Sequence, residues 1–289
     1  MALGNLAQRF LVAVVAVPIL LLILHYHRPE PTWALIFAAS LLAMRELFGM
    51  LLPPEDRNPA LVMGALACLA FYWLDPIALY RYHDLPHALD RISVEGGSIA
   101  AAFAVVVPAL YYLFRFRDIP SVASRIAGTI TGIVYAGFLT TYLAKLKLID
   151  PKQAGDTVVI VLVVAWLADT GGYFAGRFLG KAKLYEAVSP KKTWAGAIGG
   201  LAGSLVGVIV MKLAFATYLE WIDVVLIAIP GGILGQLGDL AESLIKRSVG
   251  VKDSGALLPG HGGILDRIDA VLFIAPYVYG YLIVRGIHP

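Results

Sequence analysis

The residues best suited to chemistry lie close together near the C-terminus, in the stretch from Gly235 to Asp269. Four polar side chains in this stretch are three or four positions apart and therefore share one face of a predicted helix: Asp239, Glu242, Ser243 and Lys246. Acid, hydroxyl and base would project in one direction. This is an arrangement typical of a polar site, in a chain that is otherwise mostly apolar.

A loop rich in Gly and Pro, from Gly250 to Gly263, separates this helix from a second acidic pair, Asp266 and Asp269. Carboxylates gathered from two helices repel one another unless a cation lies between them. Hard oxygen ligands beside cationic side chains suit Mg²⁺ bound to a substrate's phosphates. The alternative is a solvated loop with ordinary ion pairs, and the spacing alone leaves both interpretations open.

The composition indicates an integral membrane protein. The 289 residues are 59% hydrophobic and 15% charged, with a mean hydropathy of +0.78, values far from those of a soluble domain. A formal net charge of +3 gives no argument for a nucleic-acid partner. The single cysteine, Cys68, lies in an apolar run and is expected to be a buried, inert thiol.

A membrane-spanning helix needs about 20 apolar residues. This criterion predicts an all-α polytopic protein with about nine transmembrane helices, near residues 8–25, 32–52, 59–80, 97–114, 125–147, 156–178, 193–216, 221–246 and 267–286. Charges and glycines become frequent after residue 155, so residues 1–155 are expected to be membrane scaffold and residues 156–289 the catalytic half. Within the scaffold, Arg45 and Glu46 are interpreted as a self-paired couple near a membrane face.

The distribution of Lys and Arg favours an N-terminus on the inner side, because the inner segments then hold most of them. Lys145, Lys147 and Lys152 count against this assignment. It places the two most polar loops, residues 177–192 and 250–263, together in the cytosol. We therefore expect a polar cavity in the C-terminal half that opens to the cytosol, because irregular backbone at membrane depth must line such a cavity.

Asp169 lies deep in the predicted sixth span and is a functional candidate, because an ionisable group there is costly unless it faces a cavity or a cation. Glycines recur every four residues in this region, as in Gly172 and Gly176 and again in Gly196 and Gly200. This spacing favours close helix packing over phosphate binding. It is also compatible with a homodimer.

The segment Ser189-Pro-Lys-Lys-Thr-Trp194 is predicted to begin the seventh span, with Ser189 as the N-cap and Pro190 at the first helical position. Lys191 and Lys192 at a helix N-terminus would bind an anion. They could equally be topology anchors that interact with lipid phosphates.

At these positions the sequence resembles the bacterial phosphatidate cytidylyltransferases, the CDP-diacylglycerol synthases. The resemblance is carried by Ser243-Leu-Ile-Lys246-Arg247, Lys252-Asp253, Pro259-Gly-His261-Gly-Gly263 and Asp266-Arg267-Ile-Asp269. The segments Asp169-Thr-Gly-Gly-Tyr173 and Ser189 to Trp194 also look like those of the family. Ala195 departs from the Glu or Gln of many relatives, so no catalytic role is expected there.

The resemblance implies a Mg²⁺-dependent nucleotidyltransferase in the inner membrane of a bacterium. It would convert CTP and phosphatidic acid to CDP-diacylglycerol and pyrophosphate in phospholipid biosynthesis, at the cytosolic face. On this basis Asp239, Asp266 and Asp269 are expected to hold the metal, and Glu242 is an additional candidate. Asp169 would support that metal or bind a second cation. The residues expected to act on the phosphates are Ser189, Lys191, Lys192, Thr193, Ser243, Lys246, Arg247, Lys252, His261 and Arg267.

Two other functions remain open at this point. Another CTP-dependent lipid enzyme, such as a polyprenol kinase, would use a similar set of residues. An ion-coupled transporter would line a cation path with Asp169, Asp239 and Asp269, but it would be expected to show broken helices in both halves.

Overall fold

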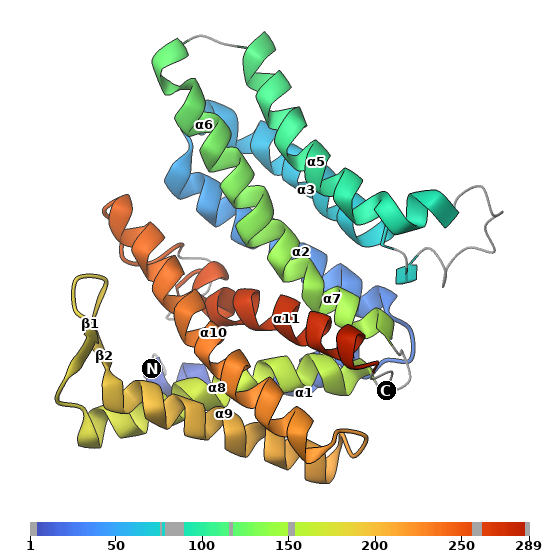
Figure 1. Ribbon diagram of the computed structural model, residues 1–289. Coiled ribbons are helices and arrows are strands. Elements are labelled where there is room, and N and C mark those ends of the chain that lie inside the picture. Colours follow the sequence, from blue (N-terminus) through green and yellow to red (C-terminus); the bar gives the residue numbers. More distant parts are fainter. Residues whose placement is uncertain are drawn as a thin grey trace.

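The protein is a bundle of long helices, seen in the computed structural model (Figure 1), which describes residues 5–75, 77–78, 90–115, 118–149, 154–255 and 262–286. The N-terminal elements are α1 (Asn5–Leu24), α2 (Glu30–Leu51), α3 (Pro54–Trp73), α5 (Asp90–Phe114), α6 (Ile119–Thr131), the π-helix η2 (Gly132–Phe138) and α7 (Leu139–Ile149). The C-terminal elements are α8 (Ala154–Leu179), β1 (Lys183–Tyr185), β2 (Ser189–Thr193), α9 (Trp194–Ala214), α10 (Trp221–Ser248) and α11 (Leu265–Arg285). In Figure 1, α2, α3 and α5 to α7 form one group, and α8 to α11 lie across its end.

Seven helical segments among the described residues are long and apolar enough to cross a membrane. They correspond to seven of the predicted spans: Glu30–Leu51, Gly96–Phe114, Ile119–Ile149, Gly155–Leu179, Trp194–Ala214, Trp221–Ser248 and Leu265–Arg285. The first predicted span corresponds to α1, in which Val14–Leu24 is an apolar stretch. The third corresponds to α3, which begins with the charged residues Glu55, Asp56 and Arg57 and is not among the seven. A polytopic helical membrane protein is therefore confirmed, and the number nine stays a prediction.

The mostly helical fold is confirmed, but the prediction that a helix begins at Ser189 is wrong. Strands β1 and β2 pair there as an antiparallel hairpin, with Tyr185 opposite Ser189. Ser189 is thus a strand residue and not the N-cap. That position belongs to Thr193, whose hydroxyl accepts a hydrogen bond of 3.1 Å from the amide of Gly196. Threonine suits both roles, because its β-branch favours extended backbone and its oxygen can cap a helix.

Helices α8 and α9 lie side by side along most of their length (Figure 1), and glycines form the contact between them. A Cβ on Gly171 would lie 2.3 Å from the carbonyl oxygen of Gly199, and one on Gly203 would lie 2.1 Å from that of Leu167. Close backbone approach is a common way for helices to associate in lipid, where the hydrophobic effect contributes little. The predicted packing role of the glycines is confirmed, and it is fulfilled within one chain.

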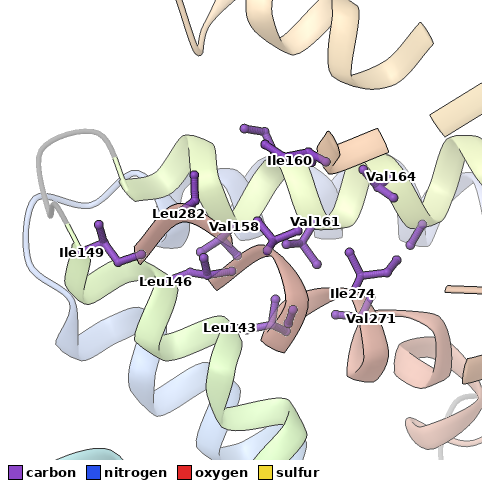
Figure 2. Packing of buried hydrophobic residues seen from close by; sticks show 14 of the residues in the cluster. Leu143, Leu146, Ile149, Val158, Ile160, Val161, Val164, Val271, Ile274 and Leu282 are labelled. Atoms are coloured by element: carbon purple, nitrogen blue, oxygen red, sulfur yellow. The ribbon is translucent and has the colours of Figure 1, made fainter. Parts of the chain in front are cut away.

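Apolar side chains from both halves of the chain share the core. Figure 2 shows Leu143 and Leu146 of α7 packed with Val158 and Val161 of α8 and with Ile274 of α11. A second cluster joins residues of α2, α3 and η2 to the start of α11. The proposed scaffold half is therefore in direct contact with the elements that carry the polar residues.

Two lysines that counted against the predicted orientation are buried within the protein. The ammonium of Lys145 lies 2.9 Å from the carboxylate of Asp75, and that of Lys147 donates a 2.6 Å hydrogen bond to the carbonyl of Leu24. Both side chains have almost no exposed surface. They are not free loop charges, so they no longer weigh against an inner N-terminus. Lys152 lies outside the described residues.

Candidate active site

A cavity of about 530 Å³ opens between α8, the hairpin, α9 and α10. Its polar lining comes from three separate segments and includes five of the predicted site residues: Asp169, Lys191, Lys192, Thr193 and Asp239. Glycines of the α8–α9 seam form part of the wall. Because these glycines carry no side chain, the backbone there can come close to a ligand. A cavity with charged side chains in its wall is thus present in the C-terminal half, and a polar cavity open to the cytosol stays a prediction.

Lys192 and Asp239 form an ion pair across this cavity, with 2.7 Å between Nζ and Oδ2. Their side chains keep 24% and 32% of their surface exposed, although the Lys192 ammonium itself is buried beside the carboxylate. Asp169 interacts electrostatically with Asp239, Lys192 and Arg267. Acidic and basic groups from α8, β2, α10 and α11 therefore act on one another here, although they are far apart in the sequence.

A second cluster lies further along α10 and is more enclosed. The ammonium of Lys246 contacts the carboxylate of Glu242 one helical turn earlier and lies 2.6 Å from Oδ1 of Asp266 on α11. The Lys246, Glu242 and Asp266 side chains are 10%, 1% and 8% exposed. A buried cation between two carboxylates compensates charges that would be costly if left alone.

Asp266 also organises the loop that precedes α11. Its carboxylate accepts hydrogen bonds from the amides of Ser254 at 3.1 Å and Gly263 at 2.9 Å. An acidic residue in the first turn of a helix interacts favourably with the free amides and the positive end of the helix dipole. Ser254 and Gly263 are thus tied to the same side chain that pairs with Lys246.

Three contacts connect the region of the Lys192–Asp239 pair with that of the Lys246 cluster. The hydroxyl of Ser243 donates a long hydrogen bond of 3.4 Å to Oδ1 of Asp239. Asp269 interacts electrostatically with Asp169, Asp239 and Glu242. Helices α10 and α11 cross closely at Gly238, where a Cβ would lie 2.6 Å from the carbonyl oxygen of Asp269. The predicted polar face of α10 is confirmed, and it connects the cavity to the enclosed cluster.

Several predicted residues lie at the edge of this region or away from it. Arg247 is exposed and donates a 2.7 Å hydrogen bond to the carbonyl of Val251, so it holds the end of α10. Lys252 and Arg267 are exposed. Ser189 is half-buried on β2 and is not part of the cavity wall. The prediction for His261 falls outside the described residues.

No three Asp, Glu, His or Cys side chains among the described residues already form a closed metal site. The carboxylates that interact around the cavity are Asp169, Asp239 and Asp269. Mg²⁺ is commonly held by one or two carboxylates, with substrate phosphates and water as the other ligands. This set of oxygen donors fits such an open site.

Sequence reasoning missed the partners of Glu46. Instead of a couple with Arg45, its carboxylate accepts hydrogen bonds from the Ser254 hydroxyl and from the amides of Ile264 and Leu265. The available signal was an acidic residue within an apolar run. Nothing in the sequence connects it with a segment more than 200 positions away, because only the folded chain brings the two together.

This chain is similar to known cytidylyltransferases. A model of the cytidylyltransferase family matches residues 7–284. The phosphatidate cytidylyltransferase of Bacillus subtilis is 34% identical over 284 residues, which cover 95% of this chain and 97% of the relative. That of Synechocystis is 36% identical over 278 residues, covering 78% and 92%, and that of Brucella suis is 44% identical over 148 residues, covering 51% and 54%. A match along nearly the whole chain shows that this protein belongs to the cytidylyltransferase family.

Proposed function

We propose that this protein catalyses the reaction of CTP with phosphatidic acid to give CDP-diacylglycerol and pyrophosphate. The observation that carries this proposal is the cavity, where Lys191 and Lys192 on the hairpin face Asp169 and Asp239 on the membrane helices. Basic groups suit a triphosphate, and carboxylates suit the cation that accompanies it. The phosphatidate cytidylyltransferases among the relatives have this substrate class in their names.

In the proposed reaction a phosphate oxygen of phosphatidic acid attacks the α-phosphorus of CTP. The bond from that phosphorus to the bridging oxygen breaks, and pyrophosphate leaves with the electron pair. A phosphate monoester at neutral pH is already an anion and needs no strong base. Catalysis then depends on positioning and on neutralising charge. Lys191 and Lys192 would bind the triphosphate of CTP, and Thr193 would keep the hairpin joined to α9.

Mg²⁺ would neutralise phosphate charge when bound and make pyrophosphate a better leaving group. We propose Asp239 and Asp269 as its carboxylate ligands, with Asp169 as a supporting group or the ligand of a second cation. Asp266 remains a proposed ligand, and binding there requires that the Lys246 ammonium move away from Oδ1. Glu242 is a weaker candidate, because its side chain is 1% exposed and pairs with Lys246.

Three exposed basic side chains and the Ser243 hydroxyl beside Asp239 would assist, and each keeps the role expected from the resemblance. The basic residues are Arg247, Lys252 and Arg267. We further propose that the chain lies in the inner membrane of a bacterium with the cavity open to the cytosol, where CTP is present. Membrane lipids would then reach the site from the side. A homodimer remains a prediction, but the α8 and α9 glycines that suggested it are occupied within the chain.

The experiment that tests the proposal supplies purified protein with phosphatidic acid and with CTP labelled separately at the α- and γ-phosphates. We expect the α-label in CDP-diacylglycerol and the γ-label in pyrophosphate. Chelation of divalent ions should stop the reaction, and added Mg²⁺ should restore it. Transfer of the γ-label to lipid would instead identify a lipid kinase of the polyprenol kinase type.

A matched variant connects the activity to this site. Asp239→Asn should abolish transfer. Asp156→Asn, which changes an acidic residue in the first turn of α8, should leave transfer intact. Asp156 pairs with His25 at 3.1 Å and does not line the cavity. Equal activity in the two variants would contradict the proposed site.

A further inference from the structure

Glu46, near the C-terminal end of α2, reaches across the protein to the first turn of α11. Its Oε1 accepts a 3.0 Å hydrogen bond from the amide of Ile264, and its Oε2 accepts one of 2.9 Å from the amide of Leu265. The hydroxyl of Ser254 donates to Oε2 at 3.1 Å. One side chain of the N-terminal half thus satisfies two of the free amides with which α11 begins.

The loop is built closely around this carboxylate. A Cβ on Gly263 would lie 2.4 Å from Oε2 of Glu46 and 2.2 Å from the Ser254 hydroxyl. A Cβ on Gly255 would lie 2.7 Å from Oε1. A side chain at either position would therefore displace the Glu46 carboxylate or the Ser254 hydroxyl from its present place. The Glu46 carboxylate is thus packed closely against the backbone at residues 255 and 263.

Ser254 joins Glu46 to Asp266. Its hydroxyl donates to Glu46 and its amide donates to Asp266, which also accepts from the amide of Gly263. The successive amides of residues 263, 264 and 265 are thus divided between the two carboxylates. Since Asp266 also pairs with Lys246, a displacement of this turn would move the ion pair as well.

We infer that Glu46 is a positioning residue for nucleotidyl transfer. It fixes the first turn of α11 and the adjoining residues, so that Asp266 and Lys246 keep their places in the enclosed cluster between α10 and α11. This inference rests on the proposed function. Glu46 does not line the cavity, so it acts on the chemical step through Asp266 and not through contact with CTP.

The test compares Glu46→Gln and Glu46→Asp with the unchanged protein. Glutamine keeps one acceptor oxygen but turns an NH₂ group toward a donor, so a carboxylate-specific contact is lost. We expect kcat to fall about tenfold or more in Glu46→Gln while KM for CTP stays within about twofold, because only positioning for the chemical step is impaired. Glu46→Asp keeps the charge and should recover part of kcat.

A second measurement does not depend on activity. Hydrogen exchange in the segment of residues 254–266 should become faster in Glu46→Gln, while exchange in the α8–α9 pair stays unchanged. Ser254→Ala, which removes the connecting hydroxyl, should show the same local change to a smaller extent. These two readouts remain informative if the wild-type protein transfers no nucleotide, a result that would refute the proposed function alone.

The matched control is Asp223→Asn. Asp223 is also a buried carboxylate in the first turn of a helix, α10. It accepts a 2.7 Å hydrogen bond from the amide of Glu220. It does not line the cavity. This variant should lose stability and keep kcat.

Unchanged kcat and exchange in Glu46→Gln would overturn the inference, and so would an equal loss of kcat in Asp223→Asn. If Glu46→Gln fails to fold, the same criteria apply to Glu46→Asp and Ser254→Ala.

Discussion

Lys246 on α10 and Asp266 on α11 are joined by an ion pair of 2.6 Å, although 20 positions separate them in the sequence. The pair is nearly inaccessible to solvent, and Glu242 contacts the same ammonium. One cation therefore balances two carboxylates at the crossing of two membrane helices. This relationship makes the chemistry of the site and the stability of the fold depend on the same side chains.

Replacing Lys246 with Met should destabilise the protein strongly, because Glu242 and Asp266 would remain buried without a cation. Breaking a buried pair in this way typically costs about 3–5 kcal/mol. Thermal unfolding in detergent would measure the loss. The double variant Lys246→Met with Glu242→Gln should regain part of the stability but none of the activity. A single variant as stable as the wild type would contradict the account of this cluster.

Lys192→Ala should weaken CTP binding, because this side chain lines the cavity and carries the positive charge beside Asp239. A hydrogen bond to a charged group contributes about 1.5–3 kcal/mol, which corresponds to a rise in KM for CTP of about tenfold to a hundredfold. The control is Lys181→Ala, an exposed lysine before the hairpin that does not line the cavity. Equal KM values in the two variants would return Lys192 to the role of a topology anchor.

Gly171→Ala should disturb the contact between α8 and α9. The new Cβ would lie 2.3 Å from a backbone oxygen, so the helices must separate, and overpacking of this kind typically costs about 1–3 kcal/mol. Gly49→Ala in α2 is the matched control, because no atom lies within 4 Å of the added carbon. Melting temperatures of the two variants in the same detergent would test this. A Gly171 variant as stable as the Gly49 variant would show that the helices can adjust without cost.

Thr193→Ala should destabilise the start of α9, because it removes the oxygen that accepts from the amide of Gly196. Loss of an N-cap typically costs about 0.5–2 kcal/mol. Thr193→Ser keeps the oxygen and should remain close to the wild type. Hydrogen exchange in the first turn of α9 would distinguish the two, and equal protection in both variants would rule out the capping role.

The sequence by itself determined the class of protein and most of the helices. Long apolar segments predict spans because a helix satisfies its own backbone in lipid, and this argument is independent of the neighbours. The i, i+3, i+4 spacing also placed Asp239, Ser243 and Lys246 on one face, since helix geometry is local. The hairpin before α9 was not foreseen, because Ser189-Pro190 is compatible with both a helix start and a strand.

Only the tertiary structure decided which charges meet. The pairing of Lys192 with Asp239 and that of Glu46 with the start of α11 join segments that no local pattern connects. Helix packing decides such contacts, and small residues such as Gly238 contribute by letting two backbones approach, here those of α10 and α11. A sequence shows that buried charges need partners. Which partners they obtain depends on how the helices cross.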